Sequence, residues 1–140
     1  MTSTKLTQPG ESRAKKYGAL HLIANLTVDG GCAINVHQGP ERIDALSGLR
    51  FDNRLDASDV YRDIRDAALA GMPIEDIAEL VRRRLVAIRG RIDGRDGMDA
   101  RVAELDRMLD RVERLAFTSD LSDGYADLNR LADSIHGPVF

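Results

Sequence analysis

The 140-residue sequence is poor in aromatic residues and in cysteine. It has no tryptophan, only 4% of its residues are aromatic, and Cys32 is its single cysteine. One cysteine cannot form an intrachain disulfide, so nothing in the sequence indicates an oxidising compartment. With so few aromatic side chains, the core has to consist mainly of leucine, isoleucine, valine and alanine. This composition suits helices packed on helices.

Long apolar runs are also missing. No segment approaches the roughly 18 apolar residues that a membrane-spanning helix needs, and the residues after Met1 are polar rather than the apolar core of a signal peptide. The formal net charge is −3, which does not favour a wholly basic nucleic-acid-binding protein, although a local basic face is enough to bind phosphate. The sequence therefore predicts one domain in the cytoplasm.

The clearest pattern lies between Asp59 and Leu115, where a helix, a break at Gly71-Met72-Pro73 and a second helix precede a helix with heptad spacing. A heptad seam this short has to pack on its own chain or on a second copy. The glycines in 93–97 favour a turn before the heptad helix, which would allow an intrachain hairpin, and the alternative is a frayed joint within one long helix. We expect a homodimeric coiled coil, and its interface residues would be Val102, Leu105, Leu109 and Val112.

The remaining segments give weaker patterns. Residues 1–13 are predicted to form a flexible tail, residues 14–26 show helical spacing, and Cys32–Val36 is either a strand or a turn of helix. Short helices are expected over 41–49 and over 119–136. The predicted fold is all-α: a small N-terminal helical unit, a helix pair and a coiled-coil hairpin. They form one helical domain over 14–140, with a dimerisation helix at about 98–117.

No group of residues indicates catalysis or a cofactor. His21, Cys32 and His37 have the side-chain types of a zinc site, but their spacing does not give a tight ligand pair and no fourth ligand lies nearby. Cys32 is better explained as a small buried residue than as a nucleophile. We expect a protein that is not an enzyme and that holds no cofactor or metal.

Arginines gather in one part of the chain. Arg82, Arg83 and Arg84 are followed by Arg89, Arg91 and Arg95, with only Asp93 among them to offset the charge. The cluster could face phosphate or an acidic partner. The favoured alternative is the exposed back of an amphipathic helix.

Residues 54–115 resemble the second half of MerR-type transcription regulators. The resemblance rests on Arg54-Leu55-Asp56-Ala57-Ser58-Asp59-Val60, on the segment from Ala70 to Val81 and on Ala103-Glu104-Leu105-Asp106-Arg107-Met108-Leu109. It implies a dimeric, DNA-binding transcription regulator whose phosphate contacts would be Arg50, Arg54, Arg82, Arg83 and Arg84. The alternative hypothesis is a non-catalytic helical interaction protein, such as an antitoxin-like, phage-encoded or scaffold adaptor.

Overall fold

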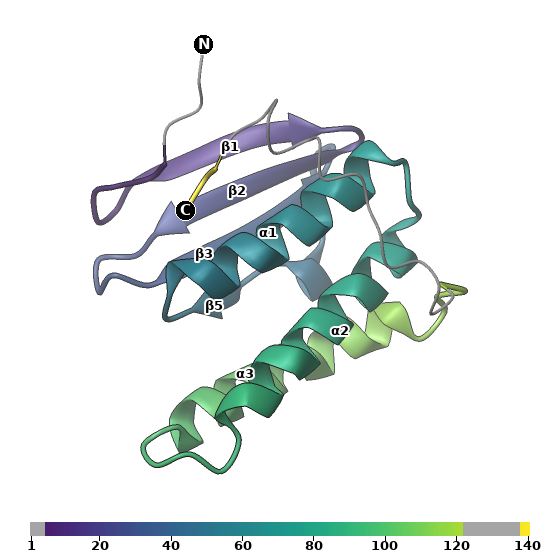
Figure 1. The fold of residues 1–140 in the computed structure, drawn as a ribbon. Coiled ribbons are helices and arrows are strands. Elements are labelled where there is room, and N and C mark those ends of the chain that lie inside the picture. The colour runs from purple at the N-terminus through teal and green to yellow at the C-terminus, as the bar shows by residue number, and fades with distance from the viewer. Residues whose placement is uncertain (1–4, 122–137) are drawn as a thin grey trace.

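A computed structural model describes residues 5–121 and 138–140, and it shows a mixed α/β fold rather than the expected all-α fold (Figure 1). An antiparallel sheet of five strands precedes three helices. The strands are β1 Ser12–Tyr17, β2 Leu20–Leu26, β3 Cys32–Gln38, β4 Glu41–Arg42 and β5 Leu49–Phe51, with a 3-10 turn, η1, at Asp44–Leu46. The helices are α1 Arg54–Leu69, α2 Ile74–Ile92 and α3 Asp99–Ala116. The helix expected over 119–136 falls largely outside the described residues.

The N-terminal helical unit was predicted wrongly, because residues 14–26 form a β-hairpin. Their apolar residues fit a helical spacing when Tyr17, Leu20 and Ile23 are counted, but Leu20, Leu22, Ala24 and Leu26 also alternate. The alternating set is the buried one, with exposed fractions of 4% or less, and period two is the signature of a strand. The short helix expected over 41–49 is likewise replaced by β4, η1 and the start of β5.

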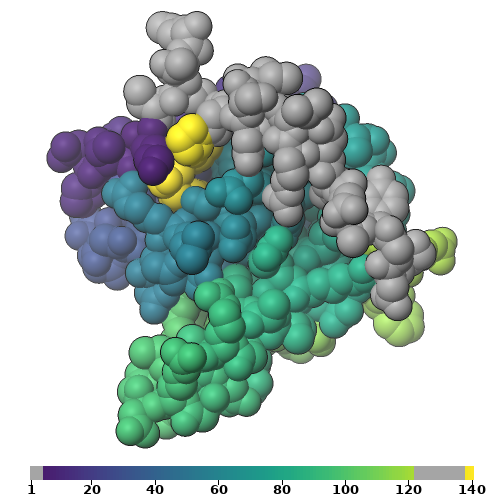
Figure 2. All heavy atoms as spheres, in the orientation of Figure 1, coloured from purple at the N-terminus to yellow at the C-terminus, as the bar shows by residue number. Residues whose placement is uncertain are grey.

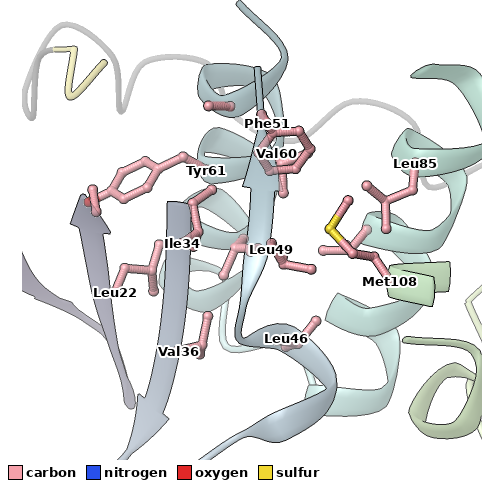
Figure 3. Close-up of a cluster of buried hydrophobic side chains, with 14 of the residues drawn as sticks. Leu22, Ile34, Val36, Leu46, Leu49, Phe51, Val60, Tyr61, Leu85 and Met108 are labelled. Carbon is pink, nitrogen blue, oxygen red and sulfur yellow. The ribbon is translucent and has the colours of Figure 1, made fainter. Parts of the chain in front are cut away.

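The sheet has one covered face and one open face. Its order is β1-β2-β3, with β4 and β5 both paired to the free edge of β3. On the inner face, Leu22, Ile34 and Leu49 meet Val60 and other residues of α1 (Figure 3). The opposite face, called the outer face below, carries the alternate strand residues. In Figure 1, α1 lies across the inner face, and the hairpin of α2 and α3 lies beyond β5.

A second part of the core lies between η1, β5 and the helical hairpin. Leu46, Leu85 and Met108 are at most 2% exposed and meet beside β5 (Figure 3). The turn between α2 and α3 contains Gly94 and Gly97, both with positive φ, a conformation that glycine adopts without strain. The far end of the hairpin projects from the rest of the molecule (Figure 2).

Helix α3 covers the edge of β5 that is not paired with β3. The Arg50 N–H donates to Met108 Sδ at 3.2 Å, and Arg101 donates to the Arg50 carbonyl at 2.7 Å. Arg111 donates to the carbonyls of Ser47 and Gly48 at 3.2 and 3.3 Å. An uncovered edge strand exposes unpaired backbone groups. Side chains of α3 supply the partners that a sixth strand would otherwise provide.

The two ends of the described chain meet on the inner side. Leu6 is 1% exposed, and its N–H donates to the Val139 carbonyl at 2.8 Å. Phe140 is 3% exposed and packs edge-on against Tyr61, with ring centroids 6.0 Å apart. Part of the segment expected to be a flexible tail therefore belongs to the core.

We predict that a side chain at Gly18, in the β1–β2 turn, destabilises the protein more than one at Gly39. A Cβ there would lie 2.5 Å from the Ala68 carbonyl oxygen at the end of α1, whereas a Cβ at Gly39, in the β3–β4 turn, would meet nothing within 4 Å. Both glycines have φ near +60°, so Gly39→Ala measures the backbone strain alone, about 1 kcal/mol. Gly18→Ala should cost about 1–3 kcal/mol more because of the clash. Urea unfolding of both variants measures the difference, and equal losses would contradict the close approach.

Candidate functional site

Basic residues line up across the outer face of the sheet. Lys16 pairs with His21, His21 with His37, and His37 with Arg42 in the register of β1, β2, β3 and β4. Residues directly opposite each other in an antiparallel sheet share a face and are close neighbours. With strands about 4.8 Å apart, the four residues span about 14 Å. We call Lys16, His21, His37 and Arg42 the basic row.

Negative charge is almost absent around the basic row. The other described strand residues of the outer face are Ser12, Ala14, Ile23, Asn25, Ala33, Asn35 and Arg50, and none of these is acidic. Within the described chain, no carboxylate forms an ion pair with Lys16, His21 or His37. Arg42 pairs with Asp44 at 2.9 Å, and both side chains are largely exposed. The row is therefore a line of basic side chains with one acid at its end.

One end of the basic row lies close to α3, beside Gly48 in the segment that leads into β5. Asn35 Oδ1 accepts the Gly48 N–H at 2.9 Å and is 3.4 Å from Arg42 Nη2. A Cβ at Gly48 would lie 3.5 Å from Arg111 Nη2 and 3.9 Å from Arg42 Nη2. Because Gly48 has no side chain, two guanidinium groups from distant parts of the sequence approach the same point on the rim of the outer face.

The five arginines predicted to bind phosphate do not form one surface. Arg50 is exposed on the outer face, whereas Arg54 begins α1 and donates to the Leu6 carbonyl at 2.6 Å. Arg82, Arg83 and Arg84 lie on α2, away from the outer face. Of the five, only Arg50 shares a face with the basic row.

Carboxylates already engage the α2 arginines. Arg82 and Arg83 pair with Glu79 at 2.6 and 2.7 Å, and Arg84 pairs with Asp63 of α1 at 2.8 Å. Hydrogen bonds from Arg82, followed by those from Arg83, lower the pKa of Glu79 from its ordinary value of 4.5 to about 2. A phosphate would have to compete with these ion pairs, so this cluster is better explained by helix packing.

The expected dimer interface is filled from within the chain. Leu105 and Val112 are 0% exposed and Leu109 is 8% exposed, while Val102 is half-buried. Helix α2 of the same chain packs against α3. Self-association stays a prediction, and in this fold it requires a surface other than Leu105 and Val112.

The sheet separates the three candidate zinc ligands. Cys32 points to the inner face and is 1% exposed, and burial raises the pKa of its thiol. His21 and His37 lie opposite each other on the outer face. Among residues 5–121 and 138–140, no group of three or more histidine, cysteine, aspartate or glutamate side chains is placed to hold a metal ion.

Sequence reasoning missed the basic row, although its signal was present. Polar residues alternate with apolar ones at His21, Asn25, Asn35 and His37, the pattern of an exposed sheet face. Only the register aligns these positions with Lys16 and Arg42.

Comparisons with known proteins give no further assignment. No protein-family model matches the chain, and neither the curated proteins nor the solved structures contain a significant match. Over the described ranges, the helices are too short or too polar to cross a membrane.

We predict that Glu79 contributes stability that acid removes. Its folded-state pKa is depressed, so the contribution is fully present above pH 4.5 and is lost as the pH falls toward 2. Glu79→Gln should lower the free energy of unfolding at pH 7 by about 1–2 kcal/mol, after allowing for solvent screening of its partly exposed arginine partners. The difference from wild type should shrink between pH 4.5 and 2.

Chemical denaturation across this pH range provides the measurement. Glu75→Gln is the matched control, because Glu75 lies one turn earlier on α2 and pairs with no arginine among the described residues. A pH-independent difference between Glu79→Gln and wild type would contradict the assigned role.

Proposed function

We propose that this protein is a binding module that holds the phosphate backbone of nucleic acid on the outer face of its sheet. The observation that supports the proposal is the basic row, in which strand register places Lys16, His21, His37 and Arg42 side by side. Arg50 adds a further positive charge on the same face. DNA association is thus retained from the sequence analysis, but on a different surface.

The distribution of charge supports this choice of ligand. The whole chain has a net charge of −3, yet the arginines of α2 are paired with carboxylates of α1, of α2, of α3 and of the turn that follows α2. On the outer face, Lys16 and Arg50 form no ion pair with a carboxylate of the described residues. Cations such as Lys16, Arg42 and Arg50 neutralise phosphates and release their counterions, which supplies affinity without reading the base sequence.

We predict that binding to DNA weakens with salt through this face. Removing one phosphate-contacting cation lowers the slope of log K against log[salt] by about 1. Lys16→Ala/Arg50→Ala should therefore reduce the slope by about 2 and weaken binding to all sequences alike. Fluorescence anisotropy with a labelled DNA duplex over a salt series measures both quantities.

The control for this prediction removes the same charge elsewhere. Lys5→Ala/Arg95→Ala changes two exposed cations, one near the chain start and one in the α2–α3 turn, and should leave the slope and affinity unchanged. If the wild type fails to bind at low salt, or if both double variants lose the same affinity, the proposal is wrong.

A further inference from the structure

A cleft of about 490 Å³ opens where three distant parts of the chain meet. Its lining comes from β4 and η1, from the first residue of α2 and from the last two turns of α3. The volume lies within the range of small-molecule sites, about 300–1,000 Å³. Of the residues proposed to bind nucleic acid, only Arg42 lines this cleft. We call it the η1 cleft.

The apolar part of the lining comes from all three segments. Ile43 precedes η1, Ile74 begins α2, and Leu115 lies in the last turn of α3. Each of these side chains packs against the core but is only partly buried, so each keeps some apolar surface in contact with water. A ligand with an apolar body would cover this surface, and removing it from water favours binding.

Arg111 supplies a positive charge that the fold holds in place. Its Nη2 donates to the carbonyl oxygens of Ser47 and Gly48 at 3.2 and 3.3 Å, and the residue is partly buried. Within the described chain no carboxylate forms an ion pair with it, whereas the neighbouring Arg114 pairs with Asp110 at 2.9 Å. The backbone carbonyls orient the guanidinium without neutralising it, and its Nε and Nη1 donors are left for a ligand.

Two acids beside the cleft limit the negative charge that a ligand can bring. Asp44 pairs with Arg42 at 2.9 Å, and the exposed Glu41 also lines the cleft. Their carboxylates repel a ligand that carries a second negative charge. Arginine matches the geometry of a carboxylate through two parallel N–H···O bonds. A monocarboxylate therefore fits Arg111 better than a doubly charged phosphate does.

We propose that the η1 cleft binds a small organic acid with one carboxylate and an aliphatic body, of the chemical class of a medium-chain fatty acid. Arg111 holds the carboxylate, and Ile43, Ile74 and Leu115 cover the aliphatic body. This binding activity is separate from the proposed function, because Lys16 and Arg50 lie outside the cleft.

Octanoate and 1-octanol test the two halves of the site. They have aliphatic chains of the same length, but only octanoate is charged. NMR titration of methyl-labelled protein at submicellar concentrations gives both the affinity and the position of each ligand. Both ligands should shift the methyl signals of Ile43, Ile74 and Leu115. Octanoate should bind about tenfold more tightly, the factor expected of a hydrogen bond to a charged group.

Arg111→Gln tests the contact with the carboxylate. This variant should bind octanoate about tenfold more weakly and 1-octanol like wild type, because only octanoate has a charge for Arg111 to hold. A merely structural role of Arg111 would weaken both ligands alike. Arg107→Gln is the matched control, since Arg107 is exposed one turn earlier on α3 and does not line the cleft. It should bind both ligands like wild type.

Ile74→Ser tests the apolar contact without altering Arg111. It should weaken both ligands by roughly threefold or more, because each loses apolar contact area. Leu55→Ser is its control, since Leu55 is 64% exposed at the start of α1 and lies outside the cleft. Thermal unfolding shows whether each variant is folded, and the comparison of the two ligands on wild type stands even if a variant is not.

Several results would overturn this inference. One is wild type that does not bind octanoate at millimolar concentration, and another is equal affinity for octanoate and 1-octanol. Methyl shifts confined to residues outside the η1 cleft, or equal losses for Arg111→Gln and Arg107→Gln, would also overturn it. DNA binding is measured separately, so the failure of either proposal is distinguishable from the failure of the other.

Discussion

The fold depends on α1 being packed on two sides at once. One side lies against the inner face of the sheet through Val60 and Ile64, both 0% exposed. The other side meets α2 through ion pairs of Asp63 with Arg84 and of Asp56 with Arg91. A helix between two layers cannot turn all its charged side chains to water, so its buried carboxylates need partners. Seven residues separate the two pairs on each helix, and this matched spacing aligns α2 antiparallel to α1.

The position of α2 determines where α3 lies. Once α2 is fixed on α1, the α2–α3 turn brings the apolar heptad positions of α3 back onto α2. A neighbouring side of α3 then lies against β5. Met108 and the two arginines Arg101 and Arg111 then meet the backbone groups of the strand edge. The same helix therefore fills the core and covers the sheet edge.

The candidate site results from this division of roles. Charges used for packing lie between α1 and α2, where carboxylates match them. The outer face takes no part in this packing, and its strand residues carry basic and neutral side chains only. Local arginine density in the sequence pointed to α2, whereas the less compensated positive charge lies on the strands and on α3. The density of a charge along a chain does not show which charges are neutralised in space.

The sequence by itself predicted the three helices, because each is long enough for its apolar period to be recognised and glycines mark the breaks between them, although the segment 93–97 also fitted a joint within one long helix. Gly71-Met72-Pro73 separates α1 from α2, and Gly94 and Gly97 lie in the turn before α3. The sheet was not determined in this way, since over 14–26 the apolar spacing fits both a helix and a strand. Only the tertiary structure decided that His21 faces His37 and that Arg42 approaches Arg111. These neighbours depend on strand register and on the docking of α3, and both are set by contacts between residues far apart in the chain.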